Sequence, residues 1–174
     1  NIVLACAAGI CFGIAGKLFS MSIKYVKAFL FKYIKFQPYH AFVGGILIIL
    51  LTKEVGTYKY NGLGLETIMS SFSNQLPVYD FLFKIIFTAV TLGSGFKGGE
   101  ITCLFFVGST LGNALSRIIK LPMSLLSGMG FVGVFAAAAN TPIACTVMAI
   151  ELFWKDVGVY AAIACLTAYL FSGH

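Results

Sequence analysis

Long apolar runs separated by short polar breaks dominate this chain. The runs show almost no polar face, which is typical of helices in lipid or in a helical membrane core. The sequence therefore predicts an all-α, polytopic membrane bundle of unequal, partly broken helices. The expected segments are Ile2–Met21, Tyr39–Thr52, a short interfacial helix Leu65–Phe72, Val78–Leu92, Gly99–Ile119, Pro122–Ala139, Ile143–Phe153 and Val157–Phe171.

Proline residues locate two of the breaks between helices. Gln37-Pro38 separates the first two runs, because proline disfavours a helical conformation in the residue before it. Asn140 or Thr141 as N-cap, followed by Pro142 in the first turn, predicts the start of another helix. We expect the aromatic and charged run 154–156 to lie at the membrane interface and to end that helix.

The composition fits a membrane protein. Of 174 residues, 59% are hydrophobic and 10% charged, whereas soluble domains have about a quarter charged residues. The net charge of +6 does not indicate nucleic-acid binding, because five lysines fall in the connection after the first segment. The positive-inside rule places that connection in the cytoplasm, near lipid head groups. These lysines are Lys17, Lys24, Lys27, Lys32 and Lys35.

Small residues recur at helical spacing in two segments. Gly9, Gly13 and Gly16 form a stripe in the first segment, and Gly108 and Gly112 form a GxxxG motif in the fourth. Glycine on a membrane helix lets a neighbouring backbone approach closely. We expect these glycines to serve helix packing rather than chemistry.

Several chemical classes are disfavoured. The five cysteines have no CxxC spacing, and His40 and His174 belong to no cluster, so we expect no metal site. No Ser/His/Asp or Cys/His set is available, so we expect neither an enzyme nor a cofactor. Gly93-x-Gly95-x-x-Gly98 matches the dinucleotide fingerprint, but no acidic residue follows at the required offset of about twenty residues.

A glycine-rich break over residues 93–99 lies between two apolar runs and is the feature that most strongly indicates a function. Backbone groups at membrane depth must be paired, so an irregular loop persists there only when protein buries it or when it lines a polar cavity. The helix that follows directs its first N–H groups and its positive dipole end toward Gly98, Gly99, Glu100 and Ile101. This arrangement predicts an anion site of the kind found at broken helices in transporters.

Two charges at the break each have two interpretations. Glu100 either complements the helix dipole, worth about 0.3 to 1 kcal/mol, or is an ionisable group beside an ion path that couples protons to anion movement. Lys97 either draws anions toward the path or is a solvated loop charge. The remaining acids are scattered along the chain and indicate no site.

The run Gly98-Gly99-Glu100-Ile101-Thr102-Cys103-Leu104-Phe105-Phe106, with Gly108-x-x-x-Gly112-Asn113, resembles the second anion-binding signature of the CLC chloride channel and transporter family. Its Gly-Gly-Glu form is similar to the bacterial fluoride-exporting branch, although Cys103 stands where that signature usually has proline. The glycine-rich start of the chain, the segment after Pro142 and the stretch from Tyr169 also resemble the family in the correct order.

The resemblance implies a site and its architecture. Backbone amides near Glu100 and Ile101 would face the anion. Glu100 and Thr102 would be the residues specific to the fluoride-exporting branch. Residues 1–174 would form a single transmembrane domain, one inverted repeat and the C-terminal half of a longer transporter. The first repeat, with its own anion loop and gating glutamate, and the last helix would be missing.

The implied function is fluoride/proton antiport for fluoride export, by a multi-pass protein of a bacterial inner membrane. Its partners would be fluoride or chloride, protons, membrane lipid, the missing N-terminal repeat and a second copy in a homodimer. A chloride channel or chloride/proton antiporter of the same family is one alternative. A non-transporting membrane module that assembles with a partner is another.

Overall fold

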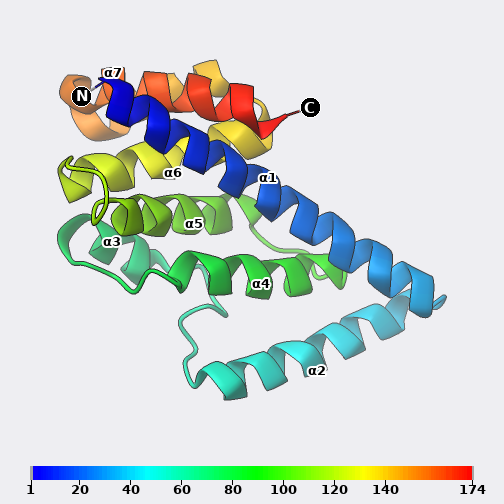
Figure 1. The fold of residues 1–174 in the computed structure, drawn as a ribbon. Coiled ribbons are helices and arrows are strands. Elements are labelled where there is room, and N and C mark those ends of the chain that lie inside the picture. The colour runs from blue at the N-terminus through cyan, green and yellow to red at the C-terminus, as the bar shows by residue number, and fades with distance from the viewer. Residues whose placement is uncertain (1, 174) are drawn as a thin grey trace.

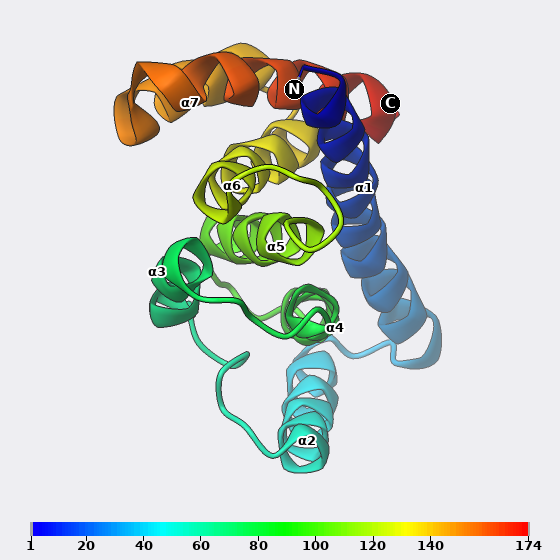
Figure 2. The ribbon, with the colours of Figure 1, turned by 60° about the vertical axis from the view of Figure 1, so that its left-hand side comes forward.

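The computed structural model describes residues 2–173, except for the side chains of 154–156. This part of the chain consists of helices stacked in layers. The layers run from α7 through α6, α5 and α4 to α2, and α1 crosses their edge (Figures 1 and 2). This confirms the all-α prediction. The helices are α1 (Ile2–Tyr33), α2 (Gln37–Val55), α3 (Leu65–Ser73), α4 (Asp80–Gly93), α5 (Glu100–Leu115), α6 (Met123–Ala139) and α7 (Pro142–Ser172).

Helix α1 is much longer than expected, and this corrects the prediction of a lysine-rich connection. It continues through Lys17, Lys24, Lys27 and Lys32 and ends only at Tyr33, so of the five lysines only Lys35 lies in the connection. The lysines mark where the helix becomes polar, not where it stops, because lysine is itself a good helix former. The break falls at residues 34–36, next to the predicted Gln37-Pro38.

Helix α2 is also longer than its apolar core. Pro38 lies in its first turn, where the missing N–H costs nothing, and Gly56 ends it with a left-handed backbone at φ 72°. At 19 residues it is long enough to cross a membrane, as is α1. The predicted short helix at Leu65–Phe72 is confirmed as α3.

Two glycines bring α5 and α6 into backbone contact. A Cβ on Gly108 would collide with the carbonyl of Gly130, and one on Gly112 with the carbonyl of Leu126. A Cβ on Gly130 would likewise collide with the carbonyl of Gly108. The GxxxG motif is therefore a packing feature, as predicted, and it fixes the position of α5.

The glycine stripe of α1 also serves packing. A Cβ on Gly13 would lie 2.6 Å from the carbonyl oxygen of Ala168 on α7, and one on Gly16 would lie 3.0 Å from that of Val134 on α6. Phe12, from the same stretch, is completely buried and packs beside Gly133. The N-terminal half of α1 is thus part of the main core.

The two arms of α7, Pro142–Phe153 and Val157–Ser172, pack against each other. A Cβ on Gly158 would lie 2.6 Å from Cγ1 of Ile150, whereas eight residues of straight helix would separate them by about 12 Å. Residues 142–172 are assigned to one helix instead of the two segments predicted, although its two arms lie against each other. The interface predicted for Trp154, Lys155 and Asp156 lies outside the described side chains.

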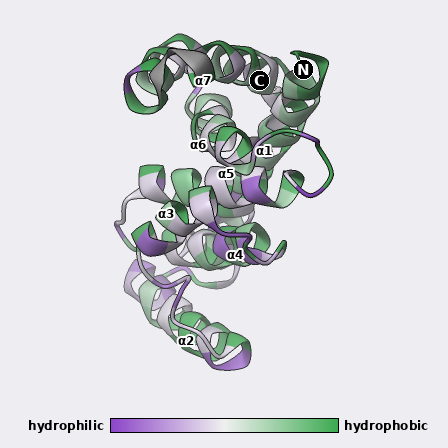
Figure 3. Cartoon of the chain, turned by 90° about the vertical axis from the view of Figure 1, so that its left-hand side faces the viewer, coloured by the Kyte–Doolittle hydropathy of each residue, from purple (hydrophilic) through white to green (hydrophobic). Residues whose placement is uncertain are grey.

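Apolar side chains fill the core and also cover much of the surface. Phe12, Phe19, Leu126 and Met129 form the centre of a core between α1, α5, α6 and α7. Figure 3 shows hydrophobic residues along α7 and the start of α1 and hydrophilic ones at loops and helix ends. Several of these hydrophobic residues, such as Val3, are exposed. This distribution suits a molecule surrounded by lipid.

Candidate functional site

The glycine break links α4 to α5 in an irregular path. Helix α4 ends at Gly93, and Gly95 has a φ of 87°, which a residue with a side chain adopts only with strain. Gly99 is the N-cap of α5, in an extended conformation, and offers no side chain to the helix. The first-turn N–H groups therefore have no capping side chain and are available to a ligand.

One face of the α5 N-terminus opens into a hollow of about 280 Å³. Glu100 and Ile101 line it from α5, and Phe135 and Ala138 line it from the end of α6. Glu100 is exposed, and Ile101 is 52% exposed. The structure thus brings two of the five predicted site residues together at one accessible surface.

The predicted glycines, Gly98 and Gly99, line a second cavity of about 220 Å³. Its other walls come from α4 and from the loop before α3, and include Lys84 and Gly62. The fifth predicted residue, Thr102, is half-buried in the first turn of α5. The predicted residues are therefore adjacent in space but divided between two sides of the helix start.

Lys97, the predicted attractor of anions, is exposed in the loop before α5. Two other lysines, Lys17 and Lys24, line a hollow of about 280 Å³ at the end of α6. That hollow shares Ala138 with the one that holds Glu100. The lysine cluster in the sequence could have indicated this hollow. We assigned those lysines to a connection and not to one face of a helix.

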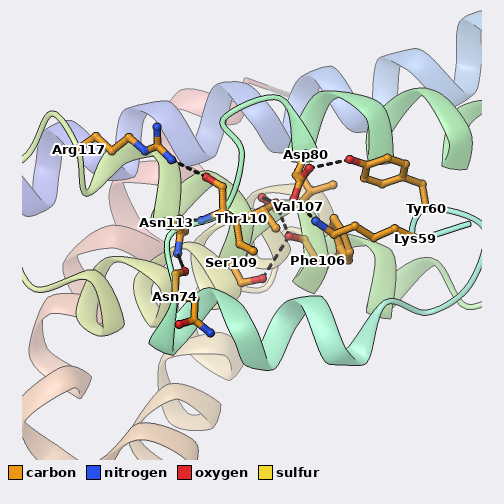
Figure 4. Close-up of polar contacts among 11 residues, drawn as sticks. Lys59, Tyr60, Asn74, Asp80, Phe106, Val107, Ser109, Thr110, Asn113 and Arg117 are labelled. Atoms are coloured by element: carbon orange, nitrogen blue, oxygen red, sulfur yellow. Dashed lines mark hydrogen bonds and ion pairs between the residues drawn. The ribbon is translucent and has the colours of Figure 1, made fainter. Parts of the chain in front are cut away.

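A buried polar cluster on α4 was not predicted. Asp80 is 1% exposed, accepts a hydrogen bond of 2.6 Å from the Tyr60 hydroxyl and forms an ion pair with Lys59 (Figure 4). Lys84, one turn later, is equally buried and donates to the carbonyls of Tyr60 and Gly62. The sequence did contain a signal for this cluster, namely two charged residues four positions apart on an otherwise apolar helix. Such charges are rare inside a protein or membrane unless they are paired.

A second unpredicted element is the buried Asn113 of α5. Its amide nitrogen donates to the carbonyls of Ser71 and Asn74, each at 2.7 Å, and its oxygen accepts from the Leu76 N–H at 2.9 Å. These bonds attach the end of α3 to α5 (Figure 4). Arg117 continues the attachment by donating to the Leu76 carbonyl at 2.8 Å.

The chemistry available at the site is electrostatic. Among the described residues, no group of three or more His, Cys, Asp or Glu side chains is placed to hold a metal ion. The hollow at Glu100 combines a helix N-terminus, one carboxylate and apolar walls. Such a site can hold a small anion and exchange a proton beside it.

Comparison with known proteins gives consistent matches. The profile of the voltage gated chloride channel family matches residues 1–173. A chloride/fluoride channel protein of Pseudomonas syringae pv. tomato is 46% identical over the whole chain, which covers 40% of that protein. The voltage-gated ClC-type chloride channel ClcB of Salmonella typhimurium is 32% identical over 66% of the chain and 30% of its own length.

The structure also resembles a solved one. The crystal structure of a CLC-type fluoride/proton antiporter superposes with a TM-score of 0.94 and 30% sequence identity. The match covers 98% of this chain and 44% of that protein. The chain therefore spans less than half the length of the relatives described here.

Proposed function

Because this chain belongs to the voltage-gated chloride channel family, we propose that the protein containing it moves a small anion across a membrane through a site at the N-terminus of α5. The observation that carries the proposal is the uncapped first turn of α5, with Glu100 and Ile101 open to a hollow. First-turn N–H groups and the helix dipole both favour a negative charge there.

Fluoride is the proposed anion, and proton antiport is the proposed mode. The named relatives support this, since one is a chloride/fluoride channel protein and another a fluoride/proton antiporter. Glu100 is the proposed coupling group because it is an exposed carboxylate in the first turn of the helix that would bind the anion. A carboxyl group there can release a proton as the anion arrives and take one up as the anion leaves.

The chain would supply one half of the transport pathway. Transporters built from inverted repeats place the anion between halves, and the hollow at Glu100 has exposed residues, Glu100 and Ile101, in its wall. We propose that an N-terminal repeat covers this face. The whole protein would be a multi-pass homodimer in a bacterial inner membrane.

Anion efflux from proteoliposomes tests the proposal. Liposomes containing the whole protein are loaded with fluoride or chloride, and release is followed with an ion-selective electrode. Fluoride efflux well above chloride efflux is expected, whereas equal or greater chloride efflux would indicate the chloride branch. Liposomes containing only residues 1–174 should release neither anion, and release from them would contradict the proposal that this chain is half a pathway.

A further inference from the structure

Lys84 places an ionisable amino group in the interior of the molecule without a carboxylate partner among the described residues. Its Nζ donates to the carbonyl oxygens of Tyr60 at 3.0 Å and Gly62 at 2.5 Å. The nearby acid, Asp80, is engaged instead by Lys59 and Tyr60. Burying an ammonium is costly, so an apolar residue would pack here more cheaply if packing were the only requirement.

Lys84 lies beside the first two turns of α5. The Nζ of Lys84 is 5.0 Å from the centre of the Phe106 ring on α5. Lys84 also lines the same cavity as Gly99, the N-cap of α5, and Cys103, one turn into the helix. Glu100 and Ile101 line a different hollow. Lys84 therefore lies on another side of the helix start and does not line the proposed anion surface.

We propose that Lys84 is a positioning residue whose fixed positive charge raises the affinity of the α5 N-terminus for a small anion. This inference rests on the proposed function, which places the anion at that terminus. The ammonium adds to the helix dipole and acts through a medium of low dielectric constant. Two backbone carbonyls hold it in place, so little reorganisation is needed when the anion binds.

A purely structural role for Lys84 makes a different prediction. Lys84 holds the loop at Tyr60 and Gly62, but Asp80 holds the same loop through Tyr60 and Lys59. The substitution Asp80→Asn therefore weakens the loop's attachment without removing a positive charge. If loop order alone sets affinity, Asp80→Asn and loss of Lys84 should have the same effect.

Equilibrium anion binding separates these roles. The whole protein is purified in detergent, and fluoride and chloride are titrated separately by calorimetry. Lys84→Gln keeps a hydrogen-bond donor for the carbonyls but loses the charge, and it should weaken fluoride binding roughly tenfold. Lys84→Arg should keep most of the affinity. Asp80→Asn should bind as tightly as the wild type or more tightly, and Lys53→Met, at an exposed position, should match the wild type.

Wild-type affinity in Lys84→Gln, or an equal loss in Asp80→Asn, would overturn the inference. Size-exclusion profiles and thermal unfolding midpoints establish that each variant is folded, and Lys84→Met replaces Lys84→Gln if that variant fails to fold. Flux distinguishes the two proposals. Wild-type liposomes that release no anion, although the protein binds it, would overturn the proposed function alone. Unchanged binding in Lys84→Gln with intact wild-type flux would overturn the role of Lys84 alone.

Discussion

At the scale of single residues, buried polar side chains link helices to one another through hydrogen bonds. Asn113 uses both ends of its amide, and Ser127 donates to the Ser71 carbonyl at 2.9 Å. No buried side-chain nitrogen or oxygen in the described part of the chain lacks a hydrogen-bond partner. Such groups fix the relative position of helices because an unpaired polar atom in an apolar interior is costly.

Replacing Asn113 by alanine should destabilise the protein by about 1 to 3 kcal/mol, because it removes the side-chain partners of the Leu76 N–H and the Asn74 carbonyl and leaves the Ser71 carbonyl with Ser127 alone. The thermal unfolding midpoint in detergent should fall accordingly. Asn74→Ala is the matched control, since the side chain of Asn74 is exposed, and it should change stability by less than about 0.5 kcal/mol. Equal midpoints for the two variants would show that Asn113 does not anchor α3.

At the scale of elements, close backbone contact fixes the position of the anion helix. The crossing of α5 with α6 depends on Gly108 and Gly112, which face the carbonyls of Gly130 and Leu126. The same crossing sets the distance between the start of α5 and Phe135 on α6, which together line the hollow at Glu100. The packing of these glycines therefore supports the site.

Gly112→Ala should destabilise the fold by about 1 to 3 kcal/mol, because the added methyl group meets the backbone of Leu126 and no flexible side chain can yield. Gly45→Ala is the matched control on α2, where a Cβ would have no neighbour within 4 Å. That variant should gain up to about 1 kcal/mol from helix propensity. Unfolding midpoints in detergent provide the comparison. An unchanged midpoint for Gly112→Ala would contradict close packing at this crossing.

The sequence predicted elements better than their tertiary partners. Breaks at Gln37-Pro38, Gly99 and Thr141-Pro142 were located because proline and glycine act locally on the backbone. The length of α1 was missed because the lysines lowered the apolar signal without ending the helix. The boundary of a polar stretch is not the boundary of a helix.

The site was predicted in part for the same reason. The start of α5 at Glu100 follows from local glycines, and so does its exposed first turn. The roles of Asp80 and Lys84 could not be predicted, because their partners lie on a loop twenty or more residues earlier in the chain. Long-range pairing of that kind leaves no periodic pattern in the sequence.

At the scale of the whole molecule, the described chain forms a well-packed bundle whose proposed site is open on one side. Large apolar residues remain exposed, among them Ile101 beside the site and Ile143 and Val147 on α7. The relatives are more than twice as long as this chain, so their remaining residues could supply the cover. Lipid and a second copy would cover the rest of this surface in the proposed dimer.

The most direct measurement records fluoride and proton movement together in liposomes of the whole protein, with Glu100→Gln beside the wild type. Glu66→Gln is the matched control, because Glu66 is also an exposed acid in the first turn of a helix. Wild type and Glu66→Gln should exchange fluoride for protons, and Glu100→Gln should lose the coupled proton movement. Chloride flux equal to or above fluoride flux, unchanged in Glu100→Gln, would mean that Glu100 only complements the dipole of α5 and that the anion is chloride.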